Sequence, residues 1–370
     1  MTIYYVTPSA NGSGDGLSIS SPMTLAQVEA VATAGDEIRL CGSPFNLTGA
    51  ATWAFDNTSL VGSENSPIVI SGYAADGTTQ AQVTIDGAGM DASTDIMTVT
   101  GNNWMVLNRI TFANAKQYGF SNTIYGGHFL FLDCVFSGCV TAGCYTNQSV
   151  SGFRFYRCRL TGNGTGFLAS SSSRGHILAV DCVFDHNTVN GAYDAVYSGS
   201  TTTQYLRPFY LRCKFYRNGG DGLKFYSSTT AGGIFVHNCT FFANGGAGIN
   251  AVGSYGQIMI EDSILLDNTT YGIQVNSSAV DKIVSCRNLV SYGNTSGHID
   301  INSGVLPGTG HVYENPYFVS ETDGSENLAP TNENLKISYT YQAGGTNSFW
   351  IGAIQPPPPA QSVGVVVVGV

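Results

Sequence analysis

A short phrase repeats through the middle of this chain and limits its possible folds more than any other feature. The phrase consists of a polar or charged residue, usually a cysteine, a variable residue and usually an apolar residue. Its second residue recurs every 24 to 31 residues, at positions 134, 158, 182, 213, 239, 263 and 289. Ser263 and Leu289 replace cysteine in the last two copies. Five residues later stands Cys139 in the first copy and an asparagine in the others: Asn163, Asn187, Asn218, Asn244, Asn268 and Asn294.

Such a period, with short β-prone runs between glycine and asparagine turns, is typical of a solenoid, in which stacked coils share one core. Leucine-rich repeats have a similar period, but they need a leucine-rich consensus and a helical limb. Runs such as Ile234-Phe235-Val236 and Ile258-Met259-Ile260 are β-branched and aromatic instead. The sequence therefore predicts an all-β, single-stranded parallel β-helix of about ten coils, with three short strands in each.

Stacking places equivalent residues about 4.8 Å apart on adjacent coils. The repeated cysteines are then expected to form an internal column. Disulfide bonds need Cβ atoms about 3.8 Å apart and a defined torsion, which in-register parallel neighbours do not offer. Reduced, buried thiols are therefore favoured over disulfides. For the asparagines, side-chain amides that bond one another and the turn backbone are favoured over a catalytic role.

The repeats make residues 1–355 one extended domain. A helix is expected at about 24–34, because Thr24 and Gln27 form a capping-box pattern before an apolar stripe. This helix is expected to cover the open N-terminal end of the solenoid. A C-terminal closing segment is expected at about 305–355, and residues 356–370 follow as a linker and tail.

The composition narrows the classes of function. Only 11% of the residues are charged and the net charge is −10, which argues against nucleic acid or a membrane as a partner. The nine cysteines are an odd number, so a disulfide framework is not expected. The histidines show no metal-ligand spacing, so no metal site is predicted. No signal peptide or transmembrane segment is recognised, and a virion or extracellular location is expected.

Both ends of the repeat region resemble right-handed β-helix proteins of the pectate-lyase-like superfamily. The start carries Tyr4-Tyr5-Val6-Thr7-Pro8 and, at 34–40, Ala-Gly-Asp-Glu-Ile-Arg-Leu; the end carries Asn315-Pro316-Tyr317-Phe318 and Ile351-Gly352-Ala353. The resemblance covers about residues 3–355 and implies a right-handed coil. It does not fix an activity, because this superfamily includes lyases, hydrolases, epimerases, phage tailspikes and inert structural proteins.

The resemblance also implies that a site lies on one long face, along the outer side of one sheet and its turns. The only coil longer than its neighbours runs from 182 to 213, and its extra residues flank 194–197. Alignment on a small residue followed by an apolar one, here Ala195-Val196, places Asp194 over Asp221 and Tyr197 over Lys224. The catalytic candidates are Asp194, Asp221 and Lys224, and the substrate-binding candidates are Tyr197, Arg174, Arg207, Asn250, Gln274 and Asp300.

Three interpretations of this site remain open. A resemblance to polysaccharide lyases implies that Lys224 abstracts the proton next to a uronate carboxylate, with Ca²⁺ or a basic group neutralising the acid. The Asp-rich calcium cluster of those lyases is missing from the chain. A resemblance to tailspike glycosidases implies that Asp194 and Asp221 form a retaining pair about 5 Å apart. The structural alternative treats Asp221-Gly222 as turn residues and Lys224 as an exposed partner of that aspartate.

The last fifteen residues indicate how the protein is used. Four prolines at 356–359 form a stiff, extended spacer, and an uncharged valine and glycine segment follows. An exposed segment of this kind pairs readily as a strand, so it is interpreted as an attachment or oligomerisation device. Packing onto its own solenoid is the alternative. The attachment residues are Val363, Val365, Val366, Val367, Val368 and Val370.

The predicted function is a structural or adhesive component of a larger assembly: a decoration, fibre or spike protein of a phage virion. The tail is expected to bind other virion subunits, and the long face is expected to bind host-surface glycans. A homo-oligomer is expected, and analogy with spikes and fibres favours a trimer. The alternative is a secreted polysaccharide lyase, epimerase or glycosidase. The sequence leaves open whether the protein is an enzyme.

Overall fold

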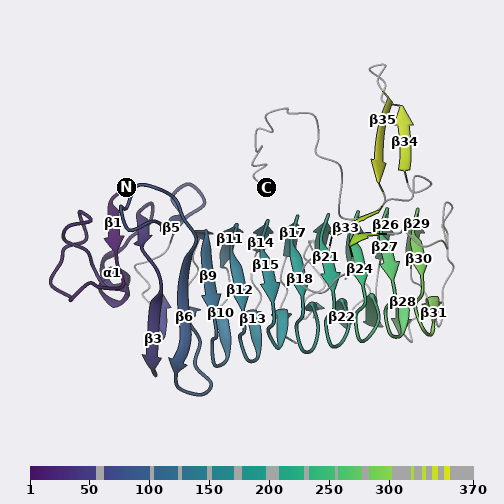
Figure 1. Cartoon of the computed structure of the whole chain (residues 1–370), viewed down its shortest axis with the longest axis horizontal. Helices are drawn as coiled ribbons and strands as arrows, with labels where there is room; N and C mark the ends of the chain where they lie inside the picture. Colours follow the sequence, from purple (N-terminus) through teal and green to yellow (C-terminus); the bar gives the residue numbers. More distant parts are fainter. Residues whose placement is uncertain are drawn as a thin grey trace.

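The computed structural model describes residues 1–55, 62–100, 104–123, 127–147, 152–170, 177–196, 208–228, 233–254, 257–276 and 283–301, and the backbone of four short strands between 318 and 350. Figure 1 shows an elongated solenoid with helix α1 (Leu25–Val31) at its N-terminal end. Each regular coil gives one strand to each of three long sheets, here named A, B and C in the order in which the chain visits them. The predicted parallel β-helix with a short N-terminal helix is confirmed.

Every pair of neighbouring strands within the three long sheets is parallel and joins residues of successive coils. Sheet A contains, in spatial order, β1 (Ile3–Val6), β2 (Glu37–Cys41), β5 (Ile68–Tyr73), β8 (Trp104–Asn108), β11 (His128–Leu132), β14 (Gly152–Tyr156), β17 (Ile177–Val180), β20 (Phe209–Leu211), β23 (Gly233–His237), β26 (Gln257–Glu261) and β29 (Ile283–Arg287).

Sheets B and C follow the same progression along the solenoid. Sheet B contains β3 (Phe45–Gly49), β6 (Val83–Met90), β9 (Ile110–Ala113), β12 (Val135–Ser137), β15 (Arg159–Thr161), β18 (Val183–Asp185), β21 (Lys214–Tyr216), β24 (Thr240–Phe242), β27 (Ile264–Leu266) and β30 (Val290–Tyr292). Sheet C contains β4 (Trp53–Phe55), β7 (Met97–Val99), β10 (Tyr118–Asn122), β13 (Ala142–Thr146), β16 (Thr165–Ala169), β19 (Ala192–Val196), β22 (Leu223–Ser228), β25 (Ile249–Ser254), β28 (Tyr271–Asn276) and β31 (Gly297–Ile301).

The interior of the solenoid is built from stacked side chains of equivalent positions. Phe184, Phe215 and Phe241 stack on successive coils, with ring centroids 4.6 and 4.7 Å apart and nearly parallel rings. Alternate residues of a strand point to opposite faces, so one residue in two enters this core. The stacking makes each coil cover the apolar surface of the next.

The cysteine column is present and reduced. All nine cysteines are free and buried. The repeated thiols each donate to a backbone carbonyl of the preceding coil; for Cys182 the acceptor is the Phe155 oxygen, at 3.4 Å. Burial raises the pKa of the Cys182 and Cys213 thiols well above the ordinary value. Ser263 continues the column, because its hydroxyl accepts from the Cys239 amide at 3.1 Å.

The asparagine column forms a buried hydrogen-bond ladder, as predicted. The Asn218 side-chain oxygen accepts from both the amide (3.2 Å) and the side-chain nitrogen (2.9 Å) of Asn187. The Asn218 side-chain nitrogen in turn donates to the Phe184 carbonyl (3.0 Å) and to the Asn244 side chain (2.9 Å). The same pattern runs from Cys139 to Asn294. Each buried amide is thereby satisfied by its neighbours.

A third column marks the corner between sheets A and B. One residue per coil adopts the left-handed backbone there, with φ between 50° and 55° at Arg109, Asp133, Arg157, Asp181, Arg212, Asn238, Asp262 and Asn288. Charges alternate along the first five positions. Arg157 pairs with Asp133, and Arg212 pairs with Asp181, each at 2.7 Å. We call these five residues the corner charge ladder.

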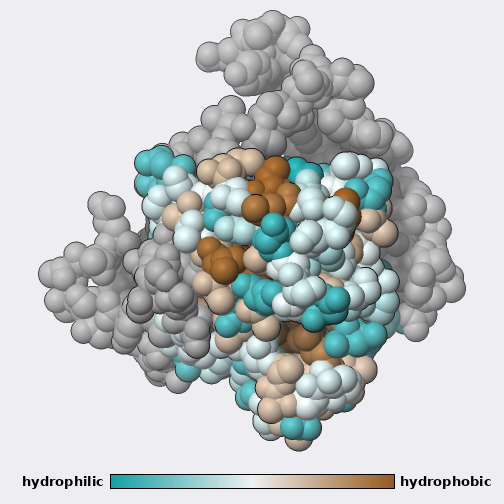
Figure 2. Space-filling view, turned by 90° about the vertical axis from the view of Figure 1, so that its left-hand side faces the viewer, coloured by the Kyte–Doolittle hydropathy of each residue, from teal (hydrophilic) through white to brown (hydrophobic). Residues whose placement is uncertain are grey.

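The two ends of the solenoid differ. Thr24 caps α1 and forms the predicted capping box with Gln27; the helix ends at Val31, three residues before the predicted end. Val28 of α1 is fully buried, and Figure 2 shows this end as a mainly hydrophilic surface with small, separate hydrophobic patches.

Beyond β31 the described backbone forms two antiparallel pairs, β32 (Phe318–Ser320) with β33 (Asn327–Pro330) and β34 (Lys336–Thr340) with β35 (Thr346–Trp350). The predicted tail, 356–370, lies outside the described residues.

Candidate functional site

The outer face of sheet C carries a continuous column of polar and aromatic side chains. The strand register joins seven partly exposed residues on successive coils: Tyr145, Leu168, Tyr193, Lys224, Asn250, Gln274 and Asp300. Their chain neighbours Phe167, Ala192, Leu223 and Ile249 are buried, which fixes the outward direction of the column. We call these seven residues the sheet C column.

The predicted alignment of the longer coil is wrong. Ala192 pairs with Leu223, so the small-apolar pair of this coil is Gly191-Ala192 and not Ala195-Val196. The error is four residues, and it moves Asp194 from the turn position over Asp221 to a strand position over the buried Phe225. Asp194 therefore lies between Ala169 and Phe225 in the core, and Tyr193, not Tyr197, lies over Lys224.

Asp194 is buried next to the Tyr210 hydroxyl. It is 1% exposed, and neither carboxyl oxygen has a hydrogen-bond partner in the described part of the chain. Burial raises its pKa to about 8, and the nearby Tyr210 hydroxyl opposes this shift without cancelling it. At neutral pH the carboxyl group is therefore mainly protonated. The predicted retaining pair with Asp221 is not formed, because Asp194 faces the core.

Asp221 lies in the turn before β22, where its carboxylate is held by the next coil. One oxygen accepts from the Ala247 amide at 2.8 Å, and the other accepts from the Asn250 side-chain nitrogen at 2.9 Å. The Asp221 amide donates to the Asn190 side chain at 2.9 Å. These contacts are those of a turn residue that joins three coils, which favours the structural interpretation of this aspartate.

Lys224 lies at the centre of the sheet C column. Its ammonium nitrogen is 5.5 Å from the centroid of the Tyr193 ring, a cation–π contact. The pKa of Tyr193 is raised by burial, with smaller contributions from Tyr226 and Asp194. On the other side of Lys224, the Asn250 side-chain oxygen is buried and has no hydrogen-bond partner among the described residues. A cation, an aromatic ring and an unused acceptor thus meet on three adjacent strands.

The structure brings together four of the predicted site residues, Lys224, Asn250, Gln274 and Asp300, in the predicted order. Their proposed binding roles remain predictions. Tyr197, Arg174 and Arg207 lie outside the described residues. Sequence reasoning missed Tyr145, which stacks on Tyr118 with ring centroids 4.0 Å apart, and Leu168 and Tyr193. Aligning the coils on Gly191 would have found Tyr193, because Gly166, Gly222 and Gly248 stand at the equivalent position of the neighbouring coils.

No metal site is formed within the described ranges, where no three His, Cys, Asp or Glu side chains are grouped to hold an ion. Within the same ranges, no helix is long and apolar enough to cross a membrane.

Comparisons with known proteins agree with this architecture. A family model described as a right-handed β-helix region matches residues 178–324. Pectate lyase Pel9A is similar over 96% of this chain and 96% of its own, with 17% identity and a TM-score of 0.62. ORF18 of Geobacillus virus E2 is similar over 84% of this chain and 60% of its own, with 11% identity and a TM-score of 0.45. A search of curated proteins finds no match.

The chain is therefore a right-handed parallel β-helix, and its fold is similar to that of a pectate lyase. At 17% identity the likeness to Pel9A shows the fold alone. The predicted handedness and fold class are confirmed, and the activity has to be argued from this chain's own residues.

Proposed function

We propose that this protein is a glycan-binding β-helix that acts as an adhesive component of a larger assembly. The observation that carries the proposal is the sheet C column, in which ring faces, amides and one ammonium group follow one another on adjacent coils. At about 4.8 Å per coil, seven coils present a strip about 29 Å long, which suits an extended polysaccharide. Sugar rings stack on tyrosine, and their hydroxyl groups bond amides and carboxylates.

The centre of the strip is the best place for a sugar. The Tyr193 ring offers an apolar face, and the Asn250 oxygen is an acceptor without a protein donor in the described part of the chain. This oxygen is buried, so a ligand hydroxyl donates to it only when the side chains that cover it move aside, and the bond then satisfies an unpaired acceptor. Lys224 adds a positive charge next to both groups and favours a carboxylate on the bound glycan.

Binding is tested with a panel of acidic and neutral polysaccharides by affinity electrophoresis and calorimetry. Tyr193→Ala and Lys224→Ala are each expected to weaken binding about three- to tenfold. Val183→Ala, on the outer face of sheet B in the coil of Tyr193, is the matched control and is expected to bind as the wild type does. Equal affinity in all four proteins, or no binding to any polysaccharide, contradicts the proposal.

Lyase chemistry is the second candidate, favoured by the outward position of Lys224 beside an unused acceptor. In that case the neutral amine of Lys224 takes the proton next to a uronate carboxylate, the released electron pair forms the C4–C5 double bond, and the C4–O glycosidic bond breaks with its oxygen taking up a proton from water. Any Ca²⁺ requirement belongs to this alternative alone. The same panel of polysaccharides distinguishes the two candidates. Unsaturated products that form with the wild type but not with Lys224→Ala support a lyase, and unchanged polysaccharide supports binding alone.

We propose a phage virion as the assembly and the segment 363–370 as the attachment strand. Support comes from its composition, because valine and glycine offer no charge or side-chain hydrogen bond to keep the segment in water. Truncation after Gln355 is expected to leave a folded β-helix that no longer enters the particle. Normal incorporation of the truncated chain, measured by gel analysis of purified particles, contradicts the attachment role.

A further inference from the structure

Five asparagines of this chain are followed directly by glycine: Asn11, Asn163, Asn190, Asn218 and Asn244. Such a pair is chemically reactive, because the glycine has no side chain to keep its backbone nitrogen away from the side-chain amide of the asparagine. Attack of that nitrogen on the amide carbon closes a succinimide ring and releases ammonia. In a folded protein the reaction depends on how firmly the nitrogen and the amide are held.

Four of the five pairs are held by hydrogen bonds within the solenoid. The glycine nitrogen of each pair donates to a backbone oxygen of a neighbouring coil over 2.7 to 3.0 Å: Gly164 to Cys139, Gly191 to Asp221, Gly219 to Asn187 and Gly245 to Asn218. The side chains of the asparagine ladder are bonded on both sides. Asn190 is 8% exposed, and its side-chain oxygen accepts from the Asp221 amide at 2.9 Å. In these four pairs the nitrogen reaches the amide carbon only when this part of the coil opens.

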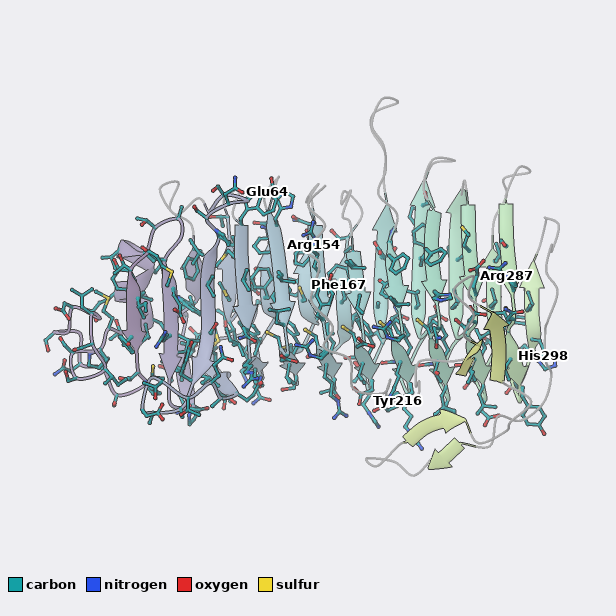
Figure 3. The ribbon with its side chains drawn as sticks, turned by 90° about the horizontal axis from the view of Figure 1, so that it is seen from above. Glu64, Arg154, Phe167, Tyr216, Arg287 and His298 are labelled. Atoms are coloured by element: carbon teal, nitrogen blue, oxygen red, sulfur yellow. The ribbon has the colours of Figure 1, made fainter. Side chains whose placement is uncertain are left out.

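Asn11 lies in the exposed loop between β1 and α1. Figure 3 labels Phe167 and Tyr216, which lie on coils of the asparagine ladder, in the middle of the solenoid and far from the N-terminal end that contains Asn11. The Gly12 nitrogen has no hydrogen bond within the described residues, and Gly12 has a φ of 82° with open space around it. The Asn11 side-chain oxygen accepts from the Ser13 amide at 3.1 Å and from the Ser13 hydroxyl at 2.6 Å. The attacking nitrogen is therefore unpaired, and the amide that it attacks is polarised.

We propose that Asn11 is a site of spontaneous deamidation and that folding protects the other four asparagines. In the first step the Gly12 nitrogen bonds the Asn11 side-chain carbon and loses its proton to water. Negative charge develops on the side-chain oxygen, where the two Ser13 donors stabilise it. The bond from this carbon to the amide nitrogen then breaks, and the nitrogen takes up a proton from water and leaves as ammonia. Water opens the succinimide ring to aspartate or isoaspartate at position 11.

The modified loop is bonded to the helix that covers the N-terminal end. The Gly12 oxygen accepts from the Gln27 side chain at 2.8 Å, and Gln27 forms the capping box of α1 with Thr24. Isoaspartate adds one carbon to the main chain beside this bond. Faster hydrogen exchange of α1 is therefore expected in protein that carries isoaspartate, and not in Asn11→Asp, which adds the charge without lengthening the main chain. Equal exchange in both would show that the modification does not reach the helix.

The part assigned to Ser13 is tested by its hydroxyl. Ser13→Ala removes the hydroxyl donor and keeps the backbone donor, so deamidation of Asn11 is expected to slow about three- to tenfold. Ser13→Thr keeps a hydroxyl and is expected to react at the wild-type rate. Ser20→Ala, which removes from the same loop a hydroxyl bonded to Ser18 at 3.0 Å, is the matched control. A wild-type rate in Ser13→Ala removes this hydroxyl from the mechanism.

The whole proposal is tested by incubating the full chain in mildly alkaline heavy-oxygen water, both folded and unfolded in guanidinium chloride, and following its peptides by mass spectrometry. In the folded chain Asn11 is expected to deamidate at least as fast as in the unfolded chain. The other four asparagines are expected to react about 100-fold or more slowly when folded, because each needs a local opening that breaks several hydrogen bonds. A slower reaction of Asn11 in the folded chain, or ladder asparagines that react as fast as Asn11, overturns the proposal.

Discussion

The asparagine ladder and the Asp194 carboxyl group are both buried and lie within one coil of each other, but they differ in their hydrogen bonding. In the asparagine ladder each side-chain amide bonds the coil before it and the coil after it, so burial leaves nothing unpaired. Asp194 is equally buried, but its neighbours above and below are Ala169 and Phe225, which offer no hydrogen bond. A buried polar group is stable in a solenoid when the repeat supplies its partner, and costly when it occurs in one coil alone.

The largest loss of stability is expected from disrupting the asparagine ladder. Asn218→Ala removes the acceptor of two Asn187 donors, and it also removes the donor to Phe184 and Asn244. Several buried groups are left unpaired, so the free energy of unfolding is expected to fall by about 3–5 kcal/mol. Urea denaturation measures it, and Thr188→Ala, an exposed residue next to Asn187, is the control. A loss below about 1 kcal/mol would show that the ladder is not what stabilises this corner.

The second prediction concerns Asp194→Val, which removes the unpaired carboxyl group from the core. The Asp194 pKa is about 8 in the folded state and near 3.8 in the unfolded state. Between these values the folded state holds a proton that the unfolded state has lost, so stability falls as pH rises from about 4 to 8. Asp194→Val is expected to flatten this dependence and to stabilise the protein by about 3 kcal/mol at pH 8. Melting curves across pH, with Asp300→Asn as the control, measure it; parallel curves for the wild type and Asp194→Val contradict the assignment.

The smallest loss of stability is expected from the cysteine column, whose buried thiols pack as small apolar groups and make weak bonds to the backbone. Cys182→Ala leaves a small cavity and is expected to destabilise the protein by about 1–2 kcal/mol. Thiol-reactive reagents are expected to modify Cys182 in the native protein very slowly, because burial raises the pKa of its thiol. A disulfide on a non-reducing gel would contradict the reduced column.

The comparison also explains which parts of the structure could be predicted. The cysteine and asparagine columns were predictable, because each repeat places the same residue type against itself in the next coil. The coil of Asp194 was misaligned, because Ala195-Val196 has the same small-apolar pattern as the true pair, Gly191-Ala192, four residues earlier. With the register wrong by four residues, Asp194, which lies in the core over Phe225, was assigned to the site over Asp221.

The arrangement of residues on the outer faces could not be predicted from the sequence, for a different reason. Outward residues are selected for what they contact outside the chain, so they do not repeat from coil to coil. Tyr193, Lys224 and Asn250 share a column but no residue type. The polar face of sheet C becomes visible only when the register of every coil is known.

The corner charge ladder bears on how the chain reaches this register during folding. The repeats are similar, so a coil that stacks on its second neighbour in place of its first would still bury phenylalanines and pair asparagines. Such a skip brings Asp133 next to Asp181, or Arg157 next to Arg212, and like charges at this distance repel. The alternating charges therefore disfavour this misaligned stacking, which the similar apolar cores of the coils would otherwise allow.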